Sequence, residues 1–327
     1  MASNGMEDTL RRFGEQFDWH PAVENSQQLG QFGHFVVAGM GGSHLGAWMI
    51  QKFDPGLELV IHRNYGVPNV PETRIRNTLF IASSYSGTTE ETLDATKAAF
   101  QKGMHIAAIS TGGALLDFAR EHQLPFITIP DTGLEPRMAV GYSTLAIARL
   151  IGNSALESAI RDGGKKVSPS EDQAAGLTMA ERLQGKIPMI WSSAKNMALA
   201  YIWKIKFNET SKIPAFCNVF PELSHNEFTG FDVVDSTRPL MEKLHVIMLE
   251  DAKDHPRIQK RMNISAQMLQ ERGIAVERVQ LKGEHFHKIF STAIYGDWVS
   301  LGLARHYDVP NPETPVIAEF KKRMAQS

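Results

Sequence analysis

The chain has 327 residues, about twice the length of a typical single-core domain, which predicts two domains of ordinary size. Hydrophobic residues make up 43% and charged residues 21% of the sequence, which excludes a disordered chain and a small disulfide-stabilised scaffold. With 34 Lys and Arg against 36 Asp and Glu, the net charge of -2 provides no global field that favours nucleic acid or an anionic membrane.

Short apolar runs alternate with helical patterns along the first half of the chain. Alternation of this kind predicts an α/β fold of βαβ units, with a mainly parallel sheet flanked by helices on both faces. Strands are predicted at residues 34–40, 59–62, 78–83, 106–110 and 126–129, and helices at residues 45–53, 90–102 and 115–121.

The alternating pattern weakens after Ile151 and then resumes. Residues 162–172 are rich in Gly, Lys, Ser and Pro and form the predicted linker. These patterns predict an N-terminal domain over residues 1–160 and a C-terminal domain over residues 161–327. In the second domain, strands are predicted at residues 189–193, 244–249 and 276–281, and helices at residues 196–207 and 284–305.

A strand, a short turn and a helix occur at residues 34–53 and again at residues 188–207. The first turn reads Gly-Met-Gly-Gly-Ser and the second reads Ser-Ser-Ala-Lys-Asn. If the halves are ancient duplicates, the second has lost the glycines that let a backbone approach a ligand.

The cysteine content and the N-terminal sequence indicate the cellular compartment in which the protein is expected. Cys217 is the only cysteine and cannot form an internal disulfide, which fits a reducing environment. No apolar run reaches the ~18–20 residues that span a bilayer, and the first residues lack the apolar core of a signal peptide. We therefore expect a cytoplasmic protein with no membrane partner and no nucleic-acid partner.

The first turn that could carry chemistry is Gly-rich and includes Gly42 and Ser43. Glycines permit close approach of the backbone, and the start of the following helix presents unpaired N–H groups to an anion. It is not a dinucleotide fingerprint, because His44 stands where that motif has its third glycine. A tight packing turn without a ligand is the alternative interpretation.

The second turn lies between the predicted strand 78–83 and the predicted helix 90–102. Its hydroxyl residues surround one glycine at a helix N-terminus, an arrangement that favours a phosphate group. Capping of the helix by Thr88 or Thr89 is the alternative, and it explains one or two of the hydroxyls. The hydroxyl residues are Ser83, Ser84, Ser86, Thr88 and Thr89.

Together these turns resemble the sugar isomerase (SIS) domain, a flavodoxin-like α/β unit that binds phosphosugars. Further blocks extend the resemblance over nearly the whole chain, so the sequence looks like the bifunctional phosphoglucose/phosphomannose isomerase family with two SIS domains. These blocks are Glu135-Pro136-Arg137, the segment from Phe207 to Ala215, Ser224-His225-Asn226-Glu227, and Thr314-Pro315 followed by Lys321.

The resemblance assigns a role to each matching residue. It implies that Arg137 lies beside the reacting carbons, that Glu209 is the base, and that His225 opens the sugar ring with help from Lys321. It also implies a homodimer, because the matching histidine in this family is donated across the dimer interface. Thr314 resembles the small hydroxyl residue linked to acceptance of both C2 epimers. The implied substrate-binding residues are Gly42, Ser43, Ser84, Ser86, Thr89 and Thr314.

The chemistry of aldose–ketose isomerisation needs these residue types. One carboxylate can move a proton between C1 and C2 through an enediolate, and an arginine stays charged to stabilise the developing oxyanion. A histidine titrates near neutrality and can shuttle the proton that opens the ring.

Each assignment has a simpler competitor in the sequence. Glu209 could be a solvated acid at a helix end, and Glu222 or Glu227 could be the base instead. His225 could be an ordinary loop histidine, and Arg137 an ordinary surface arginine. Lys321 belongs to a Lys-Lys-Arg run that is typical of a solvated helix end. Thr314 before Pro315 is a usual helix start, and residues seven apart share a helix face, so Thr314 and Lys321 could face one site.

We expect no metal and no cofactor. His285 and His287 lie about 200° apart if they begin the predicted helix, so they cannot share an ion there, although they could in a strand-like turn. The lone Cys217 excludes a multi-thiolate zinc site. The family resemblance implies an isomerase acting on glucose 6-phosphate and mannose 6-phosphate, and these observations favour one that is independent of metal. A non-catalytic sugar-phosphate sensor and an isomerase of another phosphosugar are the alternatives.

Overall fold

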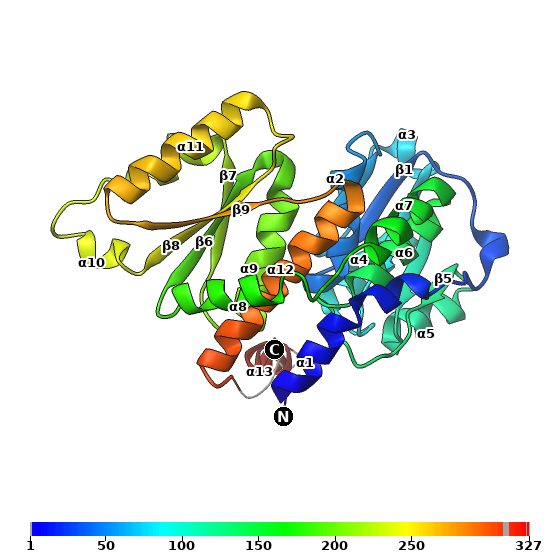
Figure 1. Cartoon of the computed structure of the whole chain (residues 1–327). Helices are drawn as coiled ribbons and strands as arrows, with labels where there is room; N and C mark the ends of the chain where they lie inside the picture. Colours follow the sequence, from blue (N-terminus) through cyan, green and yellow to red (C-terminus); the bar gives the residue numbers. More distant parts are fainter. Residues whose placement is uncertain (1, 310–313, 325, 327) are drawn as a thin grey trace. The chain divides into compact units, whose positions relative to one another are not determined.

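The computed structural model describes residues 2–309, 314–324 and 326, and the chain groups into two compact units (Figure 1). The N-terminal unit comprises residues 12–167 together with residues 283–290. The C-terminal unit comprises residues 168–282 together with the described residues before 12 and after 290. The expected division at residue 160 therefore differs from the observed grouping, because short segments far apart in the chain contribute to each unit.

The N-terminal unit is built on a five-stranded parallel sheet with the order β2-β1-β3-β4-β5. This is the flavodoxin-like order, in which ligands bind at the carboxyl edge of the strands. The strands are β1 (His34–Ala38), β2 (Leu59–His62), β3 (Thr78–Ser83), β4 (His105–Ser110) and β5 (Phe126–Thr128). Its α-helices are α2 (Leu45–Phe53), α3 (Glu72–Ile75), α4 (Glu90–Gln101), α5 (Gly113–Glu121), α6 (Val140–Ile151) and α7 (Ser154–Lys165).

Helices cover both faces of this sheet, which explains why its strands are continuous apolar runs. Every residue of β3 is buried. On one face Val36, Phe80 and Ile106 pack against α4 and α5. On the other face lie α2 and α6, which approach so closely that a Cβ atom on Gly46 would lie 2.9 Å from Ser143 Oγ. The predicted α/β class is confirmed.

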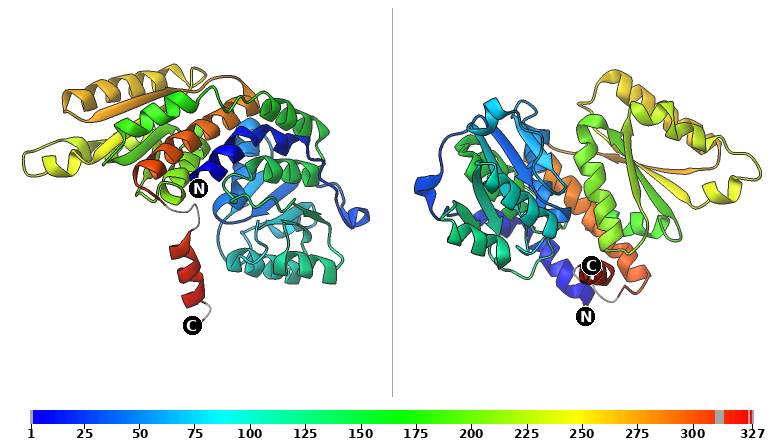
Figure 2. Two further views of the ribbon diagram at one scale, coloured as in Figure 1. Left: turned by 60° about the horizontal axis from the view of Figure 1, so that its bottom comes forward. Right: turned by 180° about the vertical axis from the view of Figure 1, so that it is seen from behind.

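The C-terminal unit holds a second parallel sheet, with the order β7-β6-β8-β9 (Figure 2). Taken in chain order this is again the arrangement 2-1-3-4, which fits the interpretation of the two halves as duplicates. The strands are β6 (Ile187–Ser193), β7 (Phe216–Phe220), β8 (Leu244–Glu250) and β9 (Ala275–Gln280). The helices are α1 (Ala2–Arg11), α8 (Gln173–Arg182), α9 (Met197–Glu209), α10 (Arg238–Met241), α11 (Pro256–Glu271), the part of α12 (His285–His306) beyond residue 290, and α13 (Pro315–Met324).

The predicted linker at residues 162–172 is wrong in its first part. Residues 162–165 form the last turn of α7, and Gly163 and Gly164 lie buried in it. A Cβ atom on Gly163 would lie 2.5 Å from Phe286 Cβ, and one on Gly164 would lie 2.3 Å from the Phe17 ring. Within α7, Gly163 therefore makes room for the start of α12 and Gly164 makes room for the Phe17 ring, so neither glycine marks a linker.

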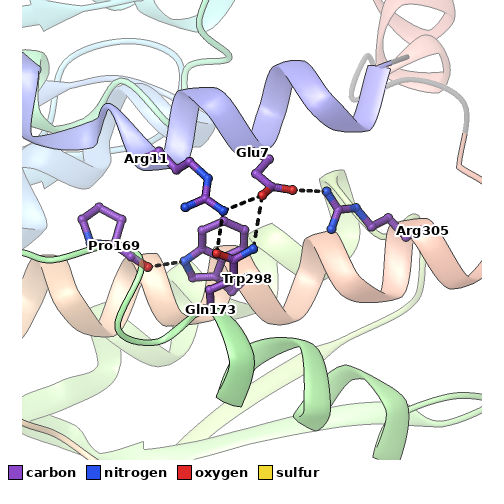
Figure 3. Close-up of polar contacts among 6 residues, drawn as sticks. All are labelled: Glu7, Arg11, Pro169, Gln173, Trp298 and Arg305. Carbon is purple, nitrogen blue, oxygen red and sulfur yellow. Dashed lines mark hydrogen bonds and ion pairs between the residues drawn. The ribbon is translucent and has the colours of Figure 1, made fainter.

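Glu7 ties the N-terminal helix α1 to α12 and α8 within the C-terminal unit (Figure 3). Its carboxylate forms an ion pair with Arg305, accepts a hydrogen bond from Arg11 at 2.7 Å, and accepts another from Gln173 at 3.2 Å. The hydrogen bonds from Arg305 and Arg11 lower the pKa of Glu7 to about 2. The first helix is thereby held to the second half of the chain.

We predict that Glu7→Gln lowers the free energy of unfolding by about 1 kcal/mol near neutral pH. Because the folded-state pKa of Glu7, about 2, lies below its ordinary value of 4.5, the stabilising effect is present above 4.5. It is lost as the pH falls from 4.5 toward about 2. Urea unfolding of the wild-type protein and of Glu7→Gln should give different free energies of unfolding at neutral pH. This difference should become smaller as the pH falls from 4.5 toward about 2. Glu121→Gln, at an exposed glutamate that ends α5, is the control; an equal loss there would contradict the prediction.

Candidate functional site

The two loops singled out in the sequence meet at the carboxyl edge of the N-terminal sheet. One follows β1 and includes a short 3-10 helix, Gly41–His44, and the other joins β3 to α4. Ser83 Oγ donates to the carbonyl oxygen of Ser43 at 2.8 Å, and the backbone N–H of Tyr85 donates to Ser43 Oγ at 2.9 Å. Because β1 and β3 are neighbours in the sheet, the two loops form one continuous surface.

Glycines allow this close packing. A Cβ atom on Gly39 would lie 2.6 Å from the carbonyl oxygen of Ser83, a distance that real Cβ atoms do not reach. Gly87 has a φ of +68°, and a Cβ atom there would lie 1.8 Å from the carbonyl oxygen of Gly112. Both positions exclude any residue with a side chain.

The hydroxyl groups of the second loop form pairs at the start of α4. Ser84 Oγ lies 2.8 Å from Thr89 Oγ1, and Ser86 Oγ lies 3.1 Å from Thr88 Oγ1. Ser84 is fully buried, whereas Ser86 and Thr88 are exposed. Thr89 is the N-cap residue of α4, yet its side chain makes no capping hydrogen bond. Capping therefore does not explain these hydroxyls, and the helix N-terminus keeps its affinity for an anion.

Arg137 belongs to the same edge of the N-terminal unit and is buried. Its side chain is 1% exposed, and Nη1 lies 3.3 Å from Glu135 Oε2. The interpretation of Arg137 as an ordinary surface arginine is therefore wrong. A Cβ atom on Gly42 would lie 2.6 Å from the carbonyl carbon of Pro136 and 2.7 Å from the Arg137 nitrogen. The absence of a side chain at Gly42 thus lets the Gly-rich loop touch the segment that carries Arg137.

One positively charged residue near the Gly-rich loop was missed in the sequence analysis. Arg63 follows β2, and its guanidinium lies 4.9 Å from the centre of the Trp48 ring. The Trp48 ring in turn lies 5.3 Å from the ring of His44, the residue after Ser43. Burial and the charge of Arg63 lower the pKa of His44 to about 4, so His44 is neutral near pH 7. The Trp48 ring, one helical turn after His44, is the only signal in the sequence for this stack.

Glu209 ends α9 in the C-terminal unit. It is half-buried between the buried residues Phe207 and Thr210, and its carbonyl oxygen accepts a hydrogen bond from Lys212 Nζ at 2.7 Å. The dipole of a helix disfavours a carboxylate at the C-terminal end, so helix stability does not account for a glutamate here. The interpretation as a fully solvated acid does not describe this position.

His225 and its acidic neighbours lie after β7. His225 is exposed and ends the short 3-10 helix Glu222–His225. Glu227 accepts hydrogen bonds on both carboxylate oxygens, from Trp191 Nε1 at 2.8 Å and from Asn218 Nδ2. This glutamate therefore has a structural role in holding the loop to the sheet. Glu222 is exposed and accepts a hydrogen bond from Asn226.

Thr314 and Lys321 belong to the last helix of the described chain. α13 begins at Pro315, and the carbonyl oxygen of Thr314 accepts hydrogen bonds from the N–H groups of Ile317 and Ala318 at 3.0 and 3.1 Å. The predicted helix start is confirmed. Lys321 is exposed, seven residues after Thr314 on the same helix face.

The corresponding turn of the C-terminal unit carries a carboxylate. Asp254, between β8 and α11, accepts a hydrogen bond from Ser193 Oγ at 2.8 Å and lies 3.3 Å from Asn196 Nδ2. All three residues are buried. Where the N-terminal unit has hydroxyl groups, the C-terminal unit has a buried carboxyl group. The two units therefore differ in the polar groups at this turn as well as in the glycines of the first turn.

The described residues contain no cluster of metal ligands and no helix that spans a membrane. Among them, no group of three or more His, Cys, Asp or Glu residues is arranged to hold a metal ion. None of the helices in the described ranges has the length and apolar character needed to cross a bilayer. His285 is the first residue of α12 but has a φ of +47°, outside the helical region, so the angle of about 200° expected between His285 and His287 does not apply.

Comparison with known proteins identifies the family. Residues 172–324 match the model of the bacterial phospho-glucose isomerase C-terminal SIS domain. The chain is 35% identical over 313 residues to the bifunctional phosphoglucose/phosphomannose isomerase of Caldicellulosiruptor bescii, covering 89% of each chain. It is 31% identical over 309 residues to that of Thermoplasma acidophilum, covering 92% of this chain and 93% of the relative. The chain belongs to the bifunctional phosphoglucose/phosphomannose isomerase family.

The membership confirms the resemblance seen in the sequence. The fold agrees as well. The crystal structure of a hypothetical protein from Thermus thermophilus matches with a TM-score of 0.70 at 16% identity, covering 99% of this chain and 89% of that chain. In this member of the family, the two units divide the expected site residues. The N-terminal unit holds Gly42, Ser43, Ser84, Ser86, Thr89 and Arg137, and the C-terminal unit holds Glu209, His225, Thr314 and Lys321.

If the paired hydroxyls bind a phosphate group, Ser86→Ala and Thr89→Val each weaken binding of inorganic phosphate about 10- to 100-fold, because hydrogen bonds to charged groups contribute about 1.5–3 kcal/mol. Isothermal titration calorimetry on the whole chain measures the affinity. Ser154→Ala, an exposed hydroxyl at the first residue of α7, is the matched control and should leave affinity unchanged. Unchanged affinity in both loop variants would place the anion site elsewhere.

Proposed function

We propose that the protein is an aldose–ketose isomerase that interconverts glucose 6-phosphate and mannose 6-phosphate with fructose 6-phosphate. Family membership over nearly the whole chain is the observation that carries the proposal. The hydroxyl-lined helix N-terminus next to a buried arginine segment supports it, because a phosphosugar isomerase needs a phosphate site and a fixed cation.

The phosphate group of the substrate is assigned to the loops of the N-terminal unit. Ser43, Ser84, Ser86 and Thr89 donate from their hydroxyls, with the dipole of α4 favouring the negative charge. Gly42 keeps the loop free of a side chain at its contact with residue 137. Binding energy from the phosphate, remote from the reacting carbons, orients the sugar for the chemical step.

Ring opening precedes isomerisation. We assign the proton transfer between the ring oxygen and the C1 hydroxyl to His225, assisted by Lys321, because an imidazole can both donate and accept a proton near neutral pH. Both residues are exposed in the single chain, where they are accessible to a bound sugar.

The isomerisation itself needs one base and one cation. Glu209 removes the proton from C2 of the open-chain aldose and returns it to C1 of the enediolate, and the reverse direction uses the same carboxylate. Arg137 stabilises the negative charge that develops on the enediolate oxygens, because a guanidinium stays charged at any working pH. Since these two groups supply the base and the cation, the proposed mechanism uses no metal and no cofactor.

Acceptance of both C2 epimers is assigned to Thr314. A small hydroxyl residue leaves room for either configuration at C2 and offers one hydrogen bond. The position of Thr314 at the start of α13, on the face that carries Lys321, supports this assignment.

The proposed functional form is a homodimer in the cytoplasm, with the partner's His225 completing each site. Exposure of His225 supports donation to a second copy. So does α13, whose apolar residues Val316 and Phe320 are 71% and 61% exposed in the single chain. The single Cys217, half-buried, fits a reducing compartment.

A non-catalytic sugar-phosphate sensor is the main competitor from another functional class. Such a protein needs the phosphate loops but neither a base nor a buried cation. The half-buried Glu209 at a helix end and the buried Arg137 favour the enzyme.

The test is the initial rate of fructose 6-phosphate formation from each aldose phosphate in excess EDTA. Both substrates should react, and Glu209→Gln should lower kcat about 10²- to 10⁴-fold while binding is retained, because it removes the general base. Glu222→Gln, the same change at an exposed glutamate, is the control and should retain full activity. Activity on glucose 6-phosphate alone would refute the role of Thr314. Inactivity on both, with thermal protection by the sugar phosphates, would establish a sensor.

If each active site combines residues from both subunits of the dimer, two inactive variants should complement each other. Mixing Glu209→Gln and His225→Ala subunits under exchange conditions forms dimers in which one of the two sites has both groups intact. Random exchange should therefore restore about one quarter of wild-type activity in a symmetric dimer. Each variant alone, treated the same way, is the control. Absence of recovery despite exchange, or active protein that sediments as a monomer, would refute a shared site.

A further inference from the structure

Buried polar contacts join α9 to α12 within the C-terminal unit. Lys206 Nζ lies 2.5 Å from Asp297 Oδ2, and these side chains are 2% and 3% exposed. Ser211 Oγ donates to the carbonyl oxygen of Ser300 at 2.8 Å, and this contact is also buried. One turn before Lys206, Trp203 Nε1 donates to the carbonyl oxygen of Thr292 at 2.8 Å.

Stability does not explain the ion pair. Removing two charges from water is costly, and well-packed apolar residues in place of a buried ion pair are often neutral or stabilising. Both side chains of the pair are almost completely buried, so both charges lose their hydration in the folded protein. The pair is therefore better explained by a requirement for geometry, because an ion pair of this kind fixes the distance and direction between two helices.

The contacts flank Glu209. Lys206 precedes it by three residues, and the carbonyl oxygen of Lys206 accepts a hydrogen bond from the N–H of Thr210 at 2.8 Å, at the C-terminal end of the helix. Ser211 follows Glu209 by two residues. On the other helix, Asp297 and Ser300 are three residues apart and share one face of α12. A single helix face thus holds the chain on both sides of Glu209.

We propose that Lys206, Asp297 and Ser211 are positioning residues that hold Glu209 for proton transfer. The proposal rests on the role of Glu209 as the base. Helix ends fray, and a carboxylate on a frayed end would sample many positions. A base must lie within about 2.6–3.2 Å of the proton it removes, and a misplacement of about 1 Å can cost about 10²-fold in rate.

The first variant is Ser211→Ala, which removes the hydrogen bond to the carbonyl oxygen of Ser300 without leaving a buried charge. We expect kcat to fall about 10-fold with KM for glucose 6-phosphate changed less than about twofold. Ser211→Thr keeps the hydroxyl and should restore most of kcat.

The second variant, Lys206→Met with Asp297→Leu, removes both charges together, because removing one would leave the other buried and unpaired. We expect kcat to fall about 10- to 100-fold in a folded protein, again with little change in KM.

The matched control is Glu7→Gln, which loosens another polar contact of α12, through Arg305. It should lower the midpoint of thermal unfolding and leave kcat unchanged. If the Ser211→Ala and the double variant also lower only the unfolding midpoint, the contacts are merely structural and the proposal is overturned.

A double-mutant cycle tests the positioning proposal separately from the proposal that Glu209 is the base. Ser211→Ala should cause no further loss in a Glu209→Gln background, because the contact acts through Glu209. An additive loss would overturn positioning and leave the role of Glu209 intact. Full activity of Glu209→Gln itself would refute the base assignment and the positioning proposal together.

Discussion

The candidate phosphate site depends on close contact between backbone segments at the carboxyl edge of the N-terminal sheet. Gly39 lies against the end of β3, Gly42 against the segment of Arg137, and Gly87 against Gly112. A side chain at any of these positions would push apart backbone segments that are in contact. Because all strands of the sheet are parallel, the turns that follow them lie at one edge, and glycines bring them into contact there.

The two sheets share a strand order but differ in the charge of the same turn. In the N-terminal unit, paired hydroxyls stand at the start of α4, whereas the buried carboxylate of Asp254 fills the equivalent place in the C-terminal unit. Neutral donors at a helix N-terminus attract an anion, and a carboxylate repels it. This difference fits a division in which the first unit binds phosphate and the second carries the acid–base residues we assign, Glu209 and His225.

The C-terminal unit combines features that stability alone does not favour. A glutamate ends α9, where the helix dipole is unfavourable, and a buried lysine three residues earlier pairs with Asp297. Lys212, just beyond, has a φ of +56°, a left-handed conformation that costs free energy in a residue other than glycine. Local costs of this kind are expected where geometry serves chemistry. The network around Glu7, by contrast, is explained by stability.

The sequence by itself determined the class of fold, most strand positions and the motifs that place the chain in its family. Those features depend on local periodicity and on short runs such as Glu135-Pro136-Arg137, which can be recognised without knowing the path of the chain. Gly163 and Gly164 show the limit. Glycine weakens a helix, so the pair predicts a linker, but the Phe17 ring and the start of α12 at Phe286, both from distant segments, occupy that space.

Only the tertiary structure decided which polar groups are buried and what they contact. Arg137 belongs to a polar motif and is nevertheless buried, and Thr89 stands at an N-cap without capping. The contact of Ser211 with Ser300 joins residues 89 positions apart, and no periodic pattern in the sequence predicts it. Helical and strand periods specify which face of an element is buried, whereas the partner of a buried polar group depends on how distant segments pack.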